Sequence, residues 1–182
     1  MTNSIIGSFL NLFGYRRSEH KERILTRRKI ENASDNELLL MIFNKLSKEL
    51  SGIPEEIAIK SWNRSKQAIY IIWLLESEVN NGGFWQFFVN SSGKFYYLIP
   101  SSLELVGASR FAELTTNVNR IYDAHASDFS KEFETTFESH KSVLSKKLFD
   151  DFDSEFYSLY ALEDLHQIQV KFIRENINDF LD

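Results

Sequence analysis

Apolar residues recur at three- and four-residue steps along most of the chain, which is the spacing of one face of an α-helix. The clearest example follows the stretch SDNE, a capping box in which Ser34 and Glu37 can satisfy each other's backbone amides. Gly52 then supplies the residue type that commonly ends a helix. We therefore predict a helix from Ser34 to about Leu50. Its apolar face is formed by Leu38, Leu39, Ile42, Phe43, Leu46 and Leu50.

A second helix is predicted from Pro54 to about Val79. Proline suits the first turn of a helix, because its missing amide has no intrahelical partner there. The later part of this segment, AIYIIWLLESEV at 68–79, is apolar on nearly all sides. A helix that is apolar all round is usually buried on all sides. We therefore expect the central helix of the domain at this place.

The helical pattern continues to the end of the chain. Pro100 predicts a break or kink within a short helix over 95–106. Further amphipathic or phenylalanine-stepped segments follow at 109–124, 125–138, 144–165 and 170–180. The chain has only 7 Gly and 2 Pro, which disfavours turn-rich sandwiches and barrels. We predict an all-α fold: one compact domain of about seven helices over 32–182, preceded by a short, basic, helical extension over 1–31.

The densest polar chemistry lies where the central helix must end, in EVNNGGFWQFFVNSSG at 78–93. Glycine adopts positive φ at little cost, so the backbone can turn sharply and a new helix can begin at once. Gln86 and Asn90 are four residues apart and share a face of that new helix. We predict a tight helix–turn–helix corner held by a partly buried cluster of amides and one carboxylate. Its residues are Glu78, Asn81, Gly82, Gly83, Phe84, Gln86, Asn90 and Gly93.

The same stretch has a functional alternative. A pocket for a small molecule or a peptide could use Glu78, Asn81, Gln86 and Trp85, with Glu78 as a general base if burial raised its pKa. No His lies nearby in the sequence. We prefer the structural corner, and the pocket stays open as the alternative.

Composition narrows the chemistry further. Cysteine is absent, so disulfides and thiolate zinc sites are excluded and a reducing cytoplasm is the expected location. The four His are far apart, and no HExxH, GxGxxG or GxxxxGK[ST] pattern occurs. We expect no metal, no cofactor and no catalytic site. The apolar run near the N-terminus is too short for a transmembrane segment. The sequence predicts a short helix there that docks on the core or frays, and a helix that binds a membrane surface or a partner is the alternative.

Charge is unevenly distributed over the chain. The net charge is −5, but residues 1–31 hold seven Lys/Arg against three Asp/Glu, and residues 121–182 hold six against fourteen. Asp151 and Glu155 are four apart, which on a helix separates them by about 6 Å along the axis and is a phosphate-like spacing. We predict that this acidic half binds a basic partner; an ordinary solvated acidic face is the alternative. The candidate carboxylates are Glu132, Glu134, Glu138, Asp150, Asp151, Asp153, Glu155, Glu163 and Asp164.

The corner motif also carries a family resemblance. The pattern ExxNGGFxQ[FY]FxNxxG, which follows a Trp-containing apolar helix and precedes Leu103, Gly107 and Ala108, is similar to the DNA-mimic-protein-19-like family. This bacterial domain is otherwise of unknown function, and the resemblance covers roughly 34–182. It implies an all-helical fold. The family's namesake is an acidic dimer that occupies the DNA-binding surface of a transcription regulator.

The resemblance therefore implies a non-enzymatic interaction protein whose partner is a basic protein such as a DNA-binding regulator, with a homodimer as the implied assembly. Direct binding of nucleic acid is not expected, because the acidic half would repel phosphates. A subunit of a toxin-neutralising or defence system that uses the NGGFxQ region stays open as an alternative, since acidic helical partners are common in such systems.

Overall fold

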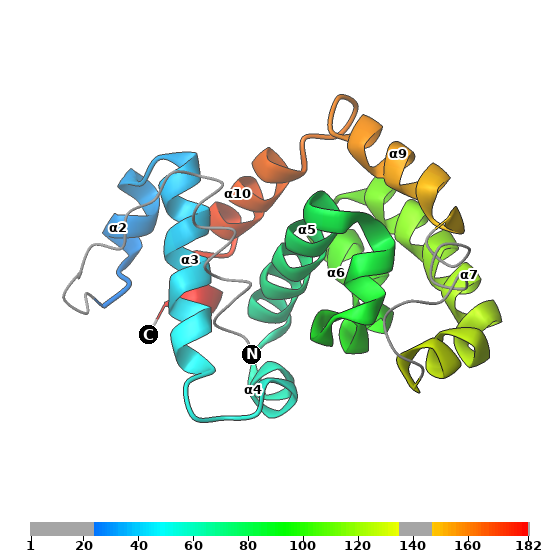
Figure 1. Ribbon diagram of the computed structural model, residues 1–182. Coiled ribbons are helices and arrows are strands. Elements are labelled where there is room, and N and C mark those ends of the chain that lie inside the picture. The colour runs from blue at the N-terminus through cyan, green and yellow to red at the C-terminus, as the bar shows by residue number, and fades with distance from the viewer. Residues whose placement is uncertain (1–23, 135–146, 182) are drawn as a thin grey trace.

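The all-α prediction is confirmed by a computed structural model, which describes residues 24–134 and 147–181. Within these ranges the chain forms eight α-helices and two 3-10 helices (Figure 1). The elements are α2 (Arg27–Asn32), α3 (Asp35–Glu49), α4 (Glu55–Ser61), α5 (Arg64–Val89), η1 (Ser91–Leu98), α6 (Ile99–Val106), α7 (Ser109–Glu134), α9 (Asp150–Leu159), α10 (Leu165–Glu175) and η2 (Ile177–Phe180).

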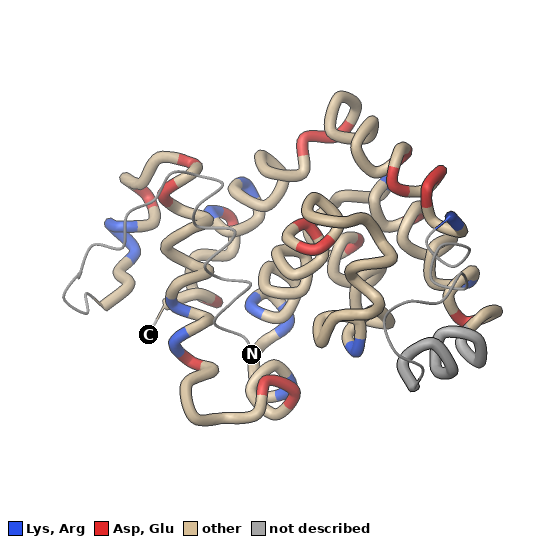
Figure 2. The backbone as a smooth tube through the Cα atoms, in the orientation of Figure 1, with Lys and Arg blue, Asp and Glu red and all other residues tan. Residues whose placement is uncertain are grey.

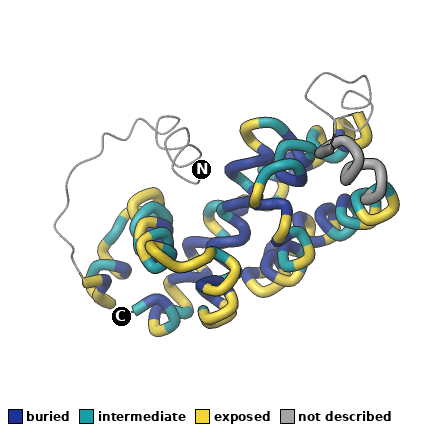
Figure 3. Tube along the Cα trace, turned by 60° about the horizontal axis from the view of Figure 1, so that its bottom comes forward, coloured by how far each residue is buried: buried dark blue, intermediate teal, exposed yellow. Residues whose placement is uncertain are grey.

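Helix α5 is the centre of the fold. It contacts α3, α6, α9, η1 and η2, with α2, α3 and α10 on one side and α6, α7 and α9 on the other (Figure 1). Ile72, Leu75 and Val79 on α5 are completely buried. Figure 3 shows the buried positions concentrated in the interior of the molecule. The all-round apolar pattern of 68–79 thus reflects burial on every side, as the sequence predicts.

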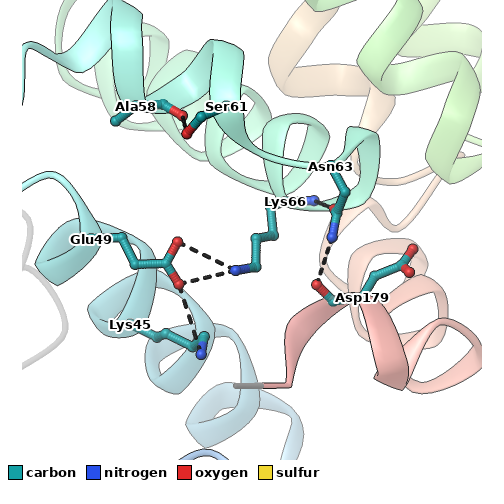
Figure 4. Close-up of polar contacts among 7 residues, drawn as sticks. All are labelled: Lys45, Glu49, Ala58, Ser61, Asn63, Lys66 and Asp179. Carbon is teal, nitrogen blue, oxygen red and sulfur yellow. Dashed lines mark hydrogen bonds and ion pairs between the residues drawn. The ribbon is translucent and has the colours of Figure 1, made fainter.

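The predicted helix from Pro54 to Val79 is wrong in one respect, because the chain breaks it into α4 and α5. Trp62 and Asn63 both have extended backbone conformations, and the Asn63 side chain accepts a hydrogen bond from the Lys66 amide at 2.9 Å. Asn63 is therefore the N-cap of α5, a role for which asparagine is strongly favoured. Its amide nitrogen also donates to the backbone oxygen of Asp179 at 2.8 Å, which ties this break to η2 (Figure 4).

Helix α3 joins α5 through charged side chains as well as through its apolar face. The predicted capping box is present: the Glu37 carboxylate accepts from the backbone amide of Ser34 at 3.0 Å. At the other end of α3, Glu49 accepts from Lys66 of α5 at 3.0 Å and pairs with Lys45 at 3.7 Å (Figure 4). Apolar burial and the Glu49–Lys66 pair fix α3 against α5, whereas the capping box and the Lys45–Glu49 pair lie within α3.

Two further boundaries differ from the expectations. Residues 91–98 form the 3-10 helix η1, and Pro100 lies in the first turn of α6, so the proline begins a helix rather than kinking one. The sequence predicts separate segments at 109–124 and 125–138, but α7 is one helix from Ser109 to Glu134. Gly107, in the left-handed conformation with φ 93°, ends α6 just before it.

Candidate functional site

The NGG step makes a sharp kink inside α5. Gly82 has φ −165° and ψ 26°, and Gly83 has φ 75° and ψ −178°, both outside the helical region. The conformation of Gly83 is essentially restricted to glycine, because a Cβ would clash with the neighbouring backbone. The kink divides α5 into a long first part and a short second part that begins at Phe84.

A buried carboxylate connects the two sides of this kink. Glu78, only 1% exposed, lies near the end of the first part of α5. It accepts hydrogen bonds from Gln86 Nε2 at 2.9 Å, from Asn90 Nδ2 at 2.7 Å and from Ser92 Oγ at 3.2 Å. All three donors follow the kink, so the carboxylate holds the second part of α5 and η1 against the first part. Because these three bonds engage both carboxylate oxygens, the structure offers no support for Glu78 as a general base in a pocket.

Two of the predicted corner residues have different roles from the rest. Asn81 is exposed, and its side chain does not hydrogen-bond to Glu78. Gly93 permits close packing of η1 on α5, since a Cβ there would lie 2.5 Å from the backbone oxygen of Phe88. Ser92, which the sequence analysis did not select, takes a place among the donors to Glu78.

Helix α9 covers the corner from outside. Asp153 Oδ1 accepts a hydrogen bond from the Phe84 backbone amide at 2.7 Å, and the Tyr157 hydroxyl donates to the Val79 backbone oxygen at 2.7 Å. Between these two bonds, the ring of Phe156 meets the ring of Phe84 edge to face with centroids 5.6 Å apart. Residues about 70 positions away in the sequence therefore contact both sides of the kink.

A second carboxylate, Glu76, was missed by the sequence analysis. This half-buried side chain accepts from the Tyr160 hydroxyl at 2.7 Å and from Gln169 Nε2 at 2.8 Å, and so links α5 to the end of α9 and to α10. Burial raises the pKa of Glu76, and burial beside this carboxylate also raises the pKa of Tyr160. The only sequence signal was an acidic residue inside the otherwise apolar run 68–79.

Three of the predicted partner-binding carboxylates act as helix caps. Asp153 binds the first amide after the kink in α5. Glu163 accepts from the backbone amides of Arg110 and Phe111 in the first turn of α7, at 3.1 and 3.2 Å. Asp164 is the N-cap of α10 and accepts from the Gln167 amide at 3.0 Å. Carboxylates are favoured at helix starts because the helix dipole is positive there. Asp153, Glu163 and Asp164 therefore have a structural role that the acidic composition of the sequence did not reveal.

The remaining acidic candidates separate into two groups. Asp150, Asp151 and Glu155 are exposed on α9. Figure 2 shows the acidic positions of α9 and of the α9–α10 connection along one edge of the molecule. Glu132 and Glu134 belong to the last turns of α7, whose side chains there lie outside the described part, and Glu138 lies outside the described residues.

The described residues offer little else as a ligand site. Among them, no three His, Asp or Glu side chains come together in a way that could hold a metal ion. A cavity of about 200 Å³ lies between α2 and the C-terminal segment, and it is lined by Arg27, Arg174 and residues 175–179, none of which belongs to the corner. None of the described helices is long and apolar enough to cross a membrane.

Comparison with known proteins supports the family resemblance that the corner motif indicated. Residues 60–176 match the model of the family described as DMP19-like protein. The chain belongs to the DMP19-like protein family. The matched span contains α5 with its kink, α9 and all of α10, and the family is not a known enzyme family. A search of curated proteins found no match.

Proposed function

We propose that this DMP19-like protein is a non-enzymatic interaction protein whose exposed carboxylates on α9 bind a basic protein surface. The observation that supports the proposal is the arrangement of Asp150, Asp151 and Glu155, which are exposed on one helix that contains no Lys or Arg. Asp151 and Glu155 are one helical turn apart, about 6 Å along the axis. Duplex DNA carries one charge per roughly 1.7 Å of axis, so these carboxylates offer part of the charge density that a DNA-binding surface recognises.

The position of α9 favours binding. The helix is fixed at the corner by two hydrogen bonds and by the buried side chain of Phe156. A preorganised surface loses less conformational entropy on association than a mobile one. The partner of this proposal is a DNA-binding regulator, the class that the family resemblance implies, and direct binding of DNA is disfavoured by repulsion between carboxylates and phosphates.

The test is capture from a bacterial lysate with the full-length protein, followed by mass spectrometry. We expect basic DNA-binding proteins to be enriched at low salt and released at high salt, because screening weakens exposed charge pairs. A variant with Asp150→Asn, Asp151→Asn and Glu155→Gln should lose this enrichment.

A matched control removes three exposed carboxylates elsewhere, through Glu31→Gln, Glu113→Gln and Glu175→Gln. This control has the same net charge as the α9 variant, so it should still capture the partner if the α9 face is the binding surface. Equal capture by the two variants, or no basic protein in the wild-type sample, would refute the proposal.

A further inference from the structure

We infer that the glycine corner is the docking site of α9, and that Asp153 and Tyr157 are positioning residues that couple the two elements. The coupling itself rests on contacts within the chain. Its consequence, that the corner sets how the acidic face of α9 is presented, rests on the proposed function.

The first argument is that α9 binds both sides of the kink at once. Asp153 and Tyr157 are four residues apart and therefore lie on one face of α9. One of them accepts from the Phe84 amide just after the glycines, and the other donates to the Val79 oxygen just before them. The first amides of a new helix have no intrahelical partner, so the Asp153 carboxylate supplies one from another helix.

The second argument is the space that Gly83 leaves. A Cβ placed on Gly83 would lie 2.1 Å from Asp153 Oδ2 and 2.7 Å from Asp153 Cγ. The Asp153 carboxylate thus occupies the volume that any side chain at position 83 would need. Glycine is required here for its backbone conformation and, separately, for the docking of α9.

The third argument is a division of roles around α9. With about 100° between successive helical residues, Asp151 and Glu155 project from the side opposite to Asp153. Asp151 and Glu155 are exposed, whereas Phe156, next to the docking pair, is completely buried. Asp151 and Glu155 therefore face solvent, whereas Asp153 holds the helix. Replacing Asp153 should change the positions of Asp151 and Glu155 without removing either carboxylate.

Hydrogen exchange measured by mass spectrometry on the full-length protein tests the coupling. Asp153→Ala should speed exchange roughly tenfold in α9 and also in 79–90, because one net hydrogen bond is lost at a shared contact. Asp153→Asn should exchange much more like the wild type, since its amide oxygen can still accept from the Phe84 amide. Tyr157→Phe should loosen the same two segments, while α3 stays unchanged in all three variants.

The inference is overturned if Asp153→Ala and Asp153→Asn exchange alike, or if α9 loosens while 79–90 does not. Should Asp153→Ala fail to fold, Tyr157→Phe alone decides, because it removes a single hydroxyl at the exposed edge of the contact. Exchange that rises in α9 but not at the corner in Tyr157→Phe would then refute the coupling.

Titration with an oligolysine peptide at low salt separates this inference from the proposed function. Asp153→Ala and Asp153→Asn remove the same charge. If Asp153 positions α9, the Asp153→Ala variant should bind the peptide several-fold more weakly than the Asp153→Asn variant. The variant with Asp150→Asn, Asp151→Asn and Glu155→Gln should lose peptide binding, while hydrogen exchange at the corner should stay as in the wild type. Unchanged peptide binding in that variant would refute the proposed function and leave the coupling intact; equal binding by the two Asp153 variants would refute the positioning role.

Discussion

Replacing Gly83 with alanine should destabilise the protein strongly, because two separate costs add at this position. The backbone of Gly83 has φ 75° and ψ −178°, a conformation whose occupation by another residue costs on the order of 1–3 kcal/mol. The added methyl group would also lie 2.1 Å from the Asp153 carboxylate, which must move and give up its bond to the Phe84 amide. Loss of such a cap costs about 1 kcal/mol.

Together these costs amount to about 2–4 kcal/mol, a large share of the roughly 5–15 kcal/mol that stabilises a typical domain. For a chain of this size each kcal/mol shifts the midpoint of thermal unfolding by about 2–4 °C, so the variant should melt about 5–15 °C below the wild type. Thermal unfolding followed by far-ultraviolet circular dichroism measures the shift.

Gly52 provides a matched control. It also has a positive φ, 78°, but a Cβ there would meet nothing within 4 Å. Gly52→Ala should therefore show a backbone cost without a clash. A Gly83→Ala variant that melts no lower than Gly52→Ala would refute the reasoning.

A double variant divides the two costs at Gly83. In Gly83→Ala combined with Asp153→Ala, the clash is absent, so the second substitution should cost much less than it does in the wild-type background. If the two effects simply add, the Asp153 carboxylate does not occupy the space that Gly83 leaves, and the steric part of the argument fails.

Two other carboxylates give further predictions. Glu78→Ala should lower the free energy of unfolding, measured by chemical denaturation, by about 2–5 kcal/mol, because three donors lose their shared acceptor. Glu78→Gln should lower it less, because one acceptor oxygen remains. Equal losses in the two variants would refute the role of Glu78 as the shared acceptor. At Glu76, burial raises the pKa, so the folded state holds this proton more tightly than the unfolded state. The contribution of Glu76 to the free energy of unfolding is therefore complete below the pKa that this group has in the unfolded state. It is lost as pH rises through the higher pKa of the folded state. Denaturation across this range should show Glu76→Gln gaining stability relative to the wild type as pH rises, and a difference that does not vary with pH would contradict the raised pKa.

The helix caps change how the acidic composition of this chain should be interpreted. Residues 121–182 contain fourteen Asp and Glu, but Asp153, Glu163 and Asp164 are engaged with backbone amides at helix starts. Such carboxylates partly neutralise the positive ends of helix dipoles and contribute less to an outward negative surface. The proposed partner-binding face is therefore better represented by the exposed Asp150, Asp151 and Glu155 than by the whole acidic half.

The sequence by itself determined the features that depend on neighbouring residues. Apolar periodicity placed the helices, the SDNE step placed the start of α3, and the NGG step placed the kink, because backbone preference and capping act within a few residues. The break at Asn63 was also local, but the apolar pattern on both sides of it concealed the cap.

Only the tertiary structure decided which carboxylates hold the fold and which face solvent. Asp153 and Glu155 look alike in the sequence, yet one binds the Phe84 amide 69 positions away and the other is exposed. Glu76 likewise acquired its role from Tyr160 and Gln169, which follow it by 84 and 93 residues. Such assignments depend on how helices pack, and the spacing of acids along one helix contains no information about the backbone groups that another helix will bring to them.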